Sequence, residues 1–205
     1  MSIQIFPAMS AANVVIVEGP HDRAALNALI DKLGAEEAAL GFAAYKIALI
    51  DAGAADASGG TGSVVRLAGA AVDLGFRTTV VLDHDRADQA TTELASAIAA
   101  ADAVIRLPEG FAIERALCDG LDDEAVRGSL RALSEGFGVQ LPDGLDELEG
   151  GELRRAIVRI LKGSGGLHAE FVAALDEGAV PPVARGVIQA VIAACTGVQT
   201  GHIQL

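Results

Sequence analysis

Residues 13–34, NVVIVEGPHDRAALNALIDKLG, contain the pattern that decides the fold. The β-branched run at 13–17 is typical of a strand that is buried on both faces. After the short segment EGPHD, the apolar residues have helical spacing, and Gly34 marks the end of the helix. The residues with this spacing are Leu26, Leu29, Ile30 and Leu33. A strand that passes directly into a helix is the repeating unit of a parallel α/β sheet.

The alternation of strand and helix continues to about residue 118, and the remainder of the chain has helical patterns only. Further strands are expected at 45–53, 78–85 and 102–108, and further helices at 63–75, 89–101, 122–136, 151–163, 167–178 and 181–197. The sequence therefore predicts an α/β fold, a parallel-stranded sheet flanked by helices, with a C-terminal all-helical subdomain. The expected divisions are an N-terminal tail or linker (1–12), a catalytic α/β domain (13–118) and a helical domain (119–205).

Composition narrows the class of protein. Hydrophobic residues make up 51% of the 205 residues, which is enough for a core. The net charge of −13 argues against a broad basic surface for nucleic acid, but it is compatible with an enzyme whose acidic cluster binds divalent cations. Cys118 and Cys195 lack metal-ligand spacing and are expected to be buried free thiols. Without a signal peptide or an apolar run of membrane-spanning length, a soluble cytoplasmic protein is expected, with no membrane partner.

Carboxylates follow the expected strands, where parallel α/β folds gather their functional groups. Glu18 follows the first strand, Asp51 the second, and Asp83 and Asp85 the third. If the first and third strands are neighbours, Glu18 faces the aspartate pair, and His84 points to the other side because successive residues of an extended chain alternate. Crowded carboxylates need protons or cations, and oxygen ligands suit Mg²⁺ or Mn²⁺.

Each motif alone also has a simpler interpretation. Aspartate after a strand is common as a turn former or helix cap, and an acidic residue before Gly-Pro is ordinary. Asp22 follows Glu18 by four residues, so it can return to the same side at the start of the helix. The combination of EGPHD after the first strand with DHD after the third is more specific than either motif.

VVIVEGPHDRAAL, followed some sixty residues later by VVLDHD, resembles the Toprim domain of topoisomerases, bacterial primases and several nucleases. Glu18 with Gly19, and Asp83 with Asp85, match the pattern of that family. Among its branches, the sequence is most similar to the C-terminal nuclease region of OLD (overcoming lysogenization defect) proteins. Asp22, Glu114 in AIERAL and Lys162 in the helical tail favour that branch.

The resemblance implies a metal-dependent endonuclease that hydrolyses DNA phosphodiester bonds with two divalent ions, Mg²⁺ or Mn²⁺. Its metal ligands would be Glu18, Asp22, Asp83, Asp85 and Glu114. Glu18 could instead act as general base, and Lys162 would offset negative charge on the phosphate. For Lys162, a role in satisfying the helix dipole is an equal alternative.

OLD proteins usually join this region to an N-terminal ATPase domain, and the sequence has no phosphate-binding loop of its own. The chain is therefore expected to be either a part of a longer protein or a stand-alone member, in neither case hydrolysing ATP. DNA is the expected partner, and a homo-oligomer is a further expectation.

Other polar residues have simpler interpretations. Arg154, Arg155 and Arg159 could contact a DNA backbone, but a solvated helical face is the simpler account. The histidines without metal spacing are expected on the surface, and residues beside the glycine-rich loop are expected to form the loop. The histidines are His21, His168 and His202, and the loop residues are Asp51, Asp56 and Ser58.

Other functions fit parts of the pattern. A non-catalytic Toprim module for binding or dimerisation in DNA repair or recombination is the main alternative, although it could dispense with Asp22, Asp85 or Glu114. RNA cleavage remains open, whereas primer synthesis would require nucleotide-binding elements that are not seen. Topoisomerase activity would require a tyrosine nucleophile, and the only tyrosine, Tyr45, starts a strand. An aspartyl-phosphate phosphatase would carry Asp-x-Asp on its first strand.

Overall fold

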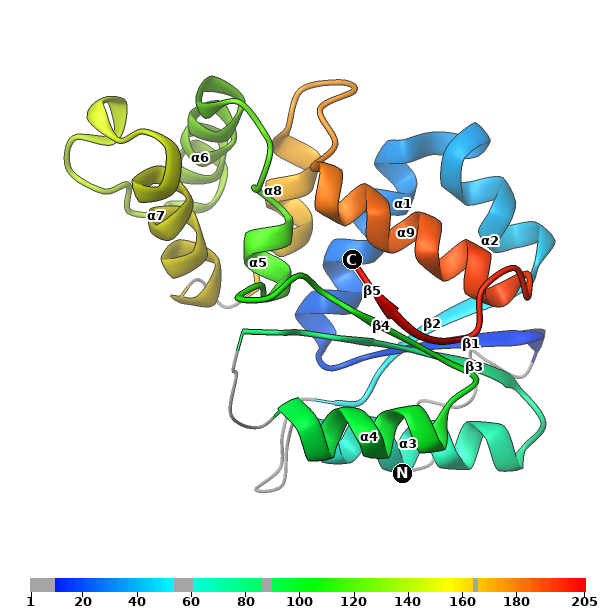
Figure 1. Cartoon of the computed structure of the whole chain (residues 1–205). Helices are drawn as coiled ribbons and strands as arrows, with labels where there is room; N and C mark the ends of the chain where they lie inside the picture. The colour runs from blue at the N-terminus through cyan, green and yellow to red at the C-terminus, as the bar shows by residue number, and fades with distance from the viewer. Residues whose placement is uncertain (1–9, 54–60, 86–89, 164–165) are drawn as a thin grey trace.

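The computed structural model of the chain describes residues 10–53, 61–85, 90–163 and 166–205, and a five-stranded parallel sheet forms its centre (Figure 1). The strand order is β2-β1-β3-β4-β5, and each pair of neighbours is parallel. The strands are β1 (Asn13–Val17), β2 (Ile47–Asp51), β3 (Arg77–Leu82), β4 (Ala103–Arg106) and β5 (Gly201–Gln204). The predicted α/β class, with its parallel sheet flanked by helices and further helices toward the C-terminus, is confirmed.

The strand β5 is the main difference from the predicted elements. Its sequence, GHIQ, is short, polar and largely exposed, so it lacks the apolar run that marks the other strands. It forms because its backbone pairs with β4, from Gly201 opposite Ala103 to Gln204 opposite Arg106. The prediction that residues beyond 118 form helices only is therefore wrong at this strand, which an edge pairing creates rather than a local propensity.

Helices cover both faces of the sheet (Figure 1). One face is covered by α3 (Thr61–Asp73) and α4 (Ala90–Ala100), and the other by α1 (Pro20–Gly34) and α9 (Pro182–Cys195). Because side chains alternate along a strand, Val14 and Ile16 belong to the first layer, and Val15 and Val17 to the second. Burial on both faces explains why β1 reads as an unbroken apolar run.

The remaining helical segments lie above the sheet or beyond the ends of its strands. They are the π-helical turn η2 (Ala35–Ala39), α2 (Leu40–Ala44), α5 (Ile113–Ala116), α6 (Asp123–Phe137), the 3-10 turn η3 (Leu145–Glu147), α7 (Gly150–Gly163) and α8 (His168–Ala174). In Figure 1, α5, α6 and α7 lie beyond the edge at which β3 and β4 end. Within the described ranges, no helix combines the length and the apolar character needed to cross a membrane.

The larger apolar core joins the two parts of the chain. It contains β1 and α1 residues such as Val15 and Leu26, and residues of the later helices such as Phe171 and Val187. Cys118 and Cys195 are buried and free, as predicted. Whether 13–118 and 119–205 fold as separate units stays a prediction, since shared packing does not measure independent stability.

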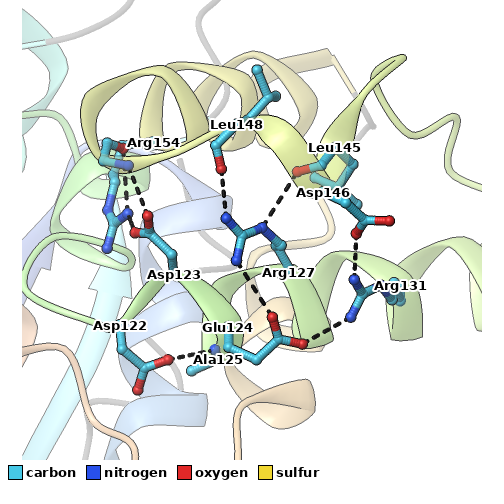
Figure 2. Close-up of polar contacts among 11 residues, drawn as sticks. Asp122, Asp123, Glu124, Ala125, Arg127, Arg131, Leu145, Asp146, Leu148 and Arg154 are labelled. Atoms are coloured by element: carbon cyan, nitrogen blue, oxygen red, sulfur yellow. Dashed lines mark hydrogen bonds and ion pairs between the residues drawn. The ribbon is translucent and has the colours of Figure 1, made fainter.

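Polar contacts fix α7 to α6 (Figure 2). Arg154 on α7 pairs with Asp123 at the start of α6 and also donates to the carbonyl of Leu121. Arg127 on α6 donates to the carbonyl oxygens of Leu145 at 3.4 Å and Leu148 at 2.8 Å, which holds the segment between the two helices. These buried or half-buried arginines bind backbone acceptors, so they brace the structure.

The first turn of α6 offers a test of this part of the fold. Asp122 is the N-cap, and its carboxylate accepts the amide of Ala125 at 2.7 Å (Figure 2). We expect Asp122→Ala to lower the free energy of unfolding by about 1 kcal/mol, or the melting temperature by roughly 2–4 °C. Thermal unfolding measures the change. Asp143→Ala, at an exposed loop aspartate, removes the same charge without a cap, and an equal loss in both variants would contradict the capping role.

Candidate functional site

Glu18 and Asp83 meet at the carboxyl edge of the sheet. β1 and β3 are neighbours, Glu18 follows Val17 at the end of β1, and Asp83 follows Leu82 at the end of β3. The Oε1 atom of Glu18 accepts the amide of Asp83 at 3.0 Å. The sequence predicts this meeting only if the first and third strands are neighbours. They are, and their pairing brings together two motifs that lie 65 positions apart in the chain.

Asp22 returns to the same edge through the turn between β1 and α1. Pro20 is the first residue of α1, where its missing N–H costs nothing, and Asp22 lies in the first helical turn. Its Oδ2 atom accepts the amide of Gly19 at 2.8 Å, which closes the turn and faces the carboxylate back toward Glu18. The i, i+4 spacing of Glu18 and Asp22 therefore has the predicted effect.

The DHD segment follows β3 and is hydrogen-bonded to the chain after β4. The amide of His84 donates to the carbonyl of Phe111 at 2.7 Å, and the amide of Gly110 donates to the carbonyl of His84 at 2.8 Å. The His84 ring lies with Nδ1 3.3 Å from the carbonyl oxygen of Leu107, at the far side of this segment. Asp83 and Asp85 consequently share one side, and His84 takes the other, as the alternation predicts.

Glu114 and Lys162 come from separate helices to the same place. Glu114 lies in the short helix α5 and Lys162 in the last turn of α7. The Nζ atom of Lys162 is 3.5 Å from Oδ2 of Asp85 and 3.8 Å from Oε2 of Glu114. The lysine is half exposed, so its charge reaches both carboxylates and solvent.

His168 is a member of this group that the sequence does not identify. It is 1% exposed, so the predicted surface position is wrong, whereas His21 and His202 are exposed as predicted. Its Nε2 atom lies 3.5 Å from Oε1 of Glu114, and its ring stacks on His21 with centroids 5.1 Å apart. Nothing near residue 168 signals this role, because its partner Glu114 is 54 positions away.

Gly166 allows the chain to pass beside the stacked histidines. It has φ +108°, and a Cβ at this position would lie 2.5 Å from Cε1 and Nδ1 of His21. Both the backbone conformation and the close approach therefore require glycine. The packing around His21 therefore depends on the absence of a side chain at Gly166.

The pKa values follow from burial and crowding. Burial, followed by the charges of the neighbouring carboxylates, raises the pKa of Asp83 to about 9. Those neighbours are Asp22, Glu18, Glu114 and Asp85. Burial also raises the pKa of Asp22, against the opposing hydrogen bond from Gly19. Burial alone would raise the pKa of Glu114 too, but His168 and Lys162 hold it below its usual range.

The donor set has the chemistry of a site for a hard divalent cation. All five acidic side chains offer oxygen, Asp83 retains a proton that a cation would replace, and Oε2 of Glu114 is buried without a hydrogen bond from any described residue. As they stand, no three histidine, cysteine, aspartate or glutamate side chains of the described segments converge on one ion position. In this arrangement the negative charge of the carboxylates is compensated by backbone amides, by Lys162 and by the proton on Asp83.

Asp51 and Tyr45 lie outside this group. Asp51 ends β2, but it is buried and pairs with Nε of Arg23 at 3.1 Å, and it accepts the amide of Gly53 at 3.1 Å. Its structural interpretation is therefore supported, while Asp56 and Ser58 lie outside the described residues. Tyr45 precedes β2, at the opposite edge of the sheet from the carboxylates, which agrees with its exclusion as a nucleophile.

The raised pKa of Asp83 predicts how pH affects stability. The folded chain keeps a proton that the unfolded chain, with a carboxyl pKa near 3.8, releases, so stability is lost as pH rises from about 4 through about 9. At pH 9 in the presence of chelator, the melting temperature of Asp83→Asn should exceed that of the native chain by at least about 4 °C. This difference in melting temperature should vanish toward about pH 4. Calorimetry against pH measures this. Asp73→Asn, at an exposed residue of α3, should follow the native curve; an Asp83→Asn curve parallel to it would disprove the prediction.

Comparison with known proteins places these observations in a family. The family model described as "Overcoming lysogenization defect protein-like, TOPRIM domain" matches residues 10–85, from the approach to β1 through the DHD segment. No match was found among curated proteins or among solved structures. The matched range includes Glu18, Asp22, Asp83 and Asp85 and ends before Glu114 and Lys162, and this type of domain indicates a nuclease-type or metal-binding module. The chain therefore contains a Toprim domain of the OLD-like type.

Proposed function

We propose that the chain is an endonuclease that hydrolyses DNA phosphodiester bonds with two Mg²⁺ or Mn²⁺ ions. The proposed ligands are Glu18, Asp22, Asp83, Asp85 and Glu114. The observation that carries this proposal is the half-buried Asp83 carboxyl, crowded by four other carboxylates, two of which, Asp85 and Glu114, face the half-exposed Lys162. A fold gains no stability from such crowding, so the arrangement is best explained by a bound cation and an anionic substrate.

Bound divalent ions would supply an activated water and stabilise charge on the leaving oxygen. Lys162 would contribute the only lysine charge at the carboxylates, since Lys32 is bonded to the carbonyl of Leu175 and Lys46 lies before β2. At the mouth of the site, between Asp85 and Glu114, its Nζ atom can contact a phosphate oxygen and offset its charge.

Glu18 and His168 have supporting roles in this proposal. Glu18, besides being a ligand, is the proposed general base, because it lies beside Asp83 at the strand edge where an attacking water would be held. His168 orients Glu114: it is buried, it approaches Oε1, and it leaves Oε2 directed toward Lys162. An N-terminal ATPase domain in a longer protein, a homo-oligomer and a cytoplasmic location stay predictions.

A non-catalytic module for binding or dimerisation is the second candidate. This candidate is favoured because four of the carboxylates already have partners without a metal ion. Lys162 pairs with Asp85 and Glu114, and backbone amides donate to Glu18 and Asp22. A module of this kind would keep that arrangement when Mn²⁺ is added, whereas a nuclease would exchange it for the ions.

The first test is cleavage of supercoiled and linear DNA with Mg²⁺, Mn²⁺ or chelator. We expect metal-dependent nicking and linearisation, reduced more than about 100-fold in Asp83→Asn because the central ligand loses its negative charge. Asp73→Asn controls for the change of charge.

Two outcomes would contradict this expectation. Equal cleavage by the native chain and Asp83→Asn would place the chemistry elsewhere. If the native chain neither cleaves nor melts higher with Mn²⁺, the binding module becomes the better account.

Lys162→Met separates catalysis from metal binding. We expect kcat to fall by about 100-fold, because the phosphate loses a positive partner, while Mn²⁺ binds more tightly, because Asp85 and Glu114 lose a competing cation. Single-turnover kinetics and Mn²⁺ titration measure the two effects. Lys46→Met, at the exposed residue before β2, is the matched control; an unchanged kcat in Lys162→Met would leave the lysine with a helix-capping role only.

A further inference from the structure

A basic cleft opens from Lys162 along α7. It has a volume of about 680 Å³ and lies between α5 and α7, with Gly110, Gly150 and Gly151 among its lining residues. Among the described residues that line it, five are basic and two are acidic. The basic residues are Arg115, Arg154, Arg155, Arg159 and Lys162, and the acidic residues are Asp85 and Asp119. The whole chain has 15 basic residues and a net charge of −13, so a third of its positive charge lines this one cleft.

Two of the arginines are engaged with the protein itself. Arg154 has a side chain only 14% exposed and pairs with Asp123 (Figure 2). It also donates to the carbonyl of Leu121. Arg115 lies over the Phe111 ring, 4.2 Å from its centroid, with Asp119 3.9 Å from Nε. These contacts shape the wall of the cleft, and they correct the interpretation of 154, 155 and 159 as one solvated group.

The other cations form a line that leads to the carboxylates. Arg155, Arg159 and Lys162 have i, i+4, i+7 spacing, which places them on one face of α7. Arg155 has only an exposed pair with Glu152 at 3.8 Å, and Arg159 is exposed and pairs with no carboxylate in the described segments. From Arg155 to Lys162 the helix rises about 10 Å, the axial length of about three phosphates of one DNA strand.

We propose that this cleft binds the sugar-phosphate backbone of the DNA strand that flanks the phosphate at the carboxylate site, with Arg155 and Arg159 as phosphate contacts. The proposal rests on the proposed nuclease function and specifies how the substrate is held. A strand placed along α7 meets Lys162 next and then Asp85, so the line of charge leads it into the site. The acidic remainder of the chain repels DNA, which makes the cleft decisive for orientation.

The test measures DNA binding in the Asp83→Asn background of the whole chain, where the duplex stays uncut. The probe is a short fluorescein-labelled duplex, titrated at several salt concentrations. Each of Arg155→Gln and Arg159→Gln should weaken binding roughly five- to tenfold at about 0.1 M salt and reduce the slope of log K against log salt by about one. Arg66→Gln, at an exposed arginine of α3 on the opposite face of the sheet, makes the same charge change and should have no effect.

Several results would overturn the proposal. An equal loss in Arg66→Gln and Arg159→Gln would mean that only total charge matters. Unchanged salt slopes, absence of binding in the Asp83→Asn chain, or displacement of the duplex by a mononucleotide at equal phosphate concentration would each exclude a strand-binding cleft.

The experiments can contradict the proposed DNA-binding cleft and the proposed nuclease function independently of each other. If no protein cleaves DNA but the arginine variants weaken binding as expected, the cleft stands and the nuclease function falls. If the native chain cleaves and the Arg155→Gln and Arg159→Gln variants bind and cleave as it does, the nuclease stands and the cleft assignment is wrong.

Discussion

Repulsion among carboxylates at one edge of the sheet is the constraint on which the surrounding structure depends. Five acidic side chains arrive there from β1, α1, β3 and α5, and two of them, Asp83 and Asp22, are pushed by burial toward the protonated form. Such a cluster is tolerated only where hydrogen-bond donors and cations face it. Here the donors are the amides of Gly19 and Asp83, and the cation is Lys162.

The later helices supply much of that compensation. Lys162 lies in the last turn of α7 and His168 begins α8, so two successive helices supply the groups that face Glu114. Gly166, just before α8, leaves no room for a side chain beside His21, and α7 is held by the pairing of Arg154 with Asp123 (Figure 2). The helical region thus completes the electrostatics of the sheet edge, even though the family match ends at residue 85.

For binding of nucleic acid, the distribution of charge over the surface matters more than the net charge. A net charge of −13 suggests a poor partner for nucleic acid, yet the cleft is lined by five basic residues against two acidic ones. The cleft begins where the carboxylate group ends, with Asp85 and Lys162 common to both. An anionic strand would therefore be attracted along α7 and exposed to the carboxylates only at the position where cations would be bound.

The sequence by itself determined the features that depend on neighbouring residues. β-branched runs, helical spacing and closing glycines located β1, β3, α1, α6 and α9, and the alternation of strand and helix placed the ends of the strands at one edge. From that rule it followed that Glu18 and Asp83 meet once β1 and β3 pair. Tertiary structure alone decided the rest, because these features join residues far apart in the chain.

Particular residues show the difference. β5 exists through pairing with β4, His168 is buried through its approach to Glu114, and Asp51 is paired with Arg23 rather than available to the site. Arg154 and Arg159 are chemically identical and lie on one helix, but Arg154 pairs with Asp123 of α6, whereas Arg159 is exposed and pairs with no carboxylate among the described residues. Local propensity acts over a few residues, whereas burial, charge compensation and pairing depend on which distant segments the fold brings into contact.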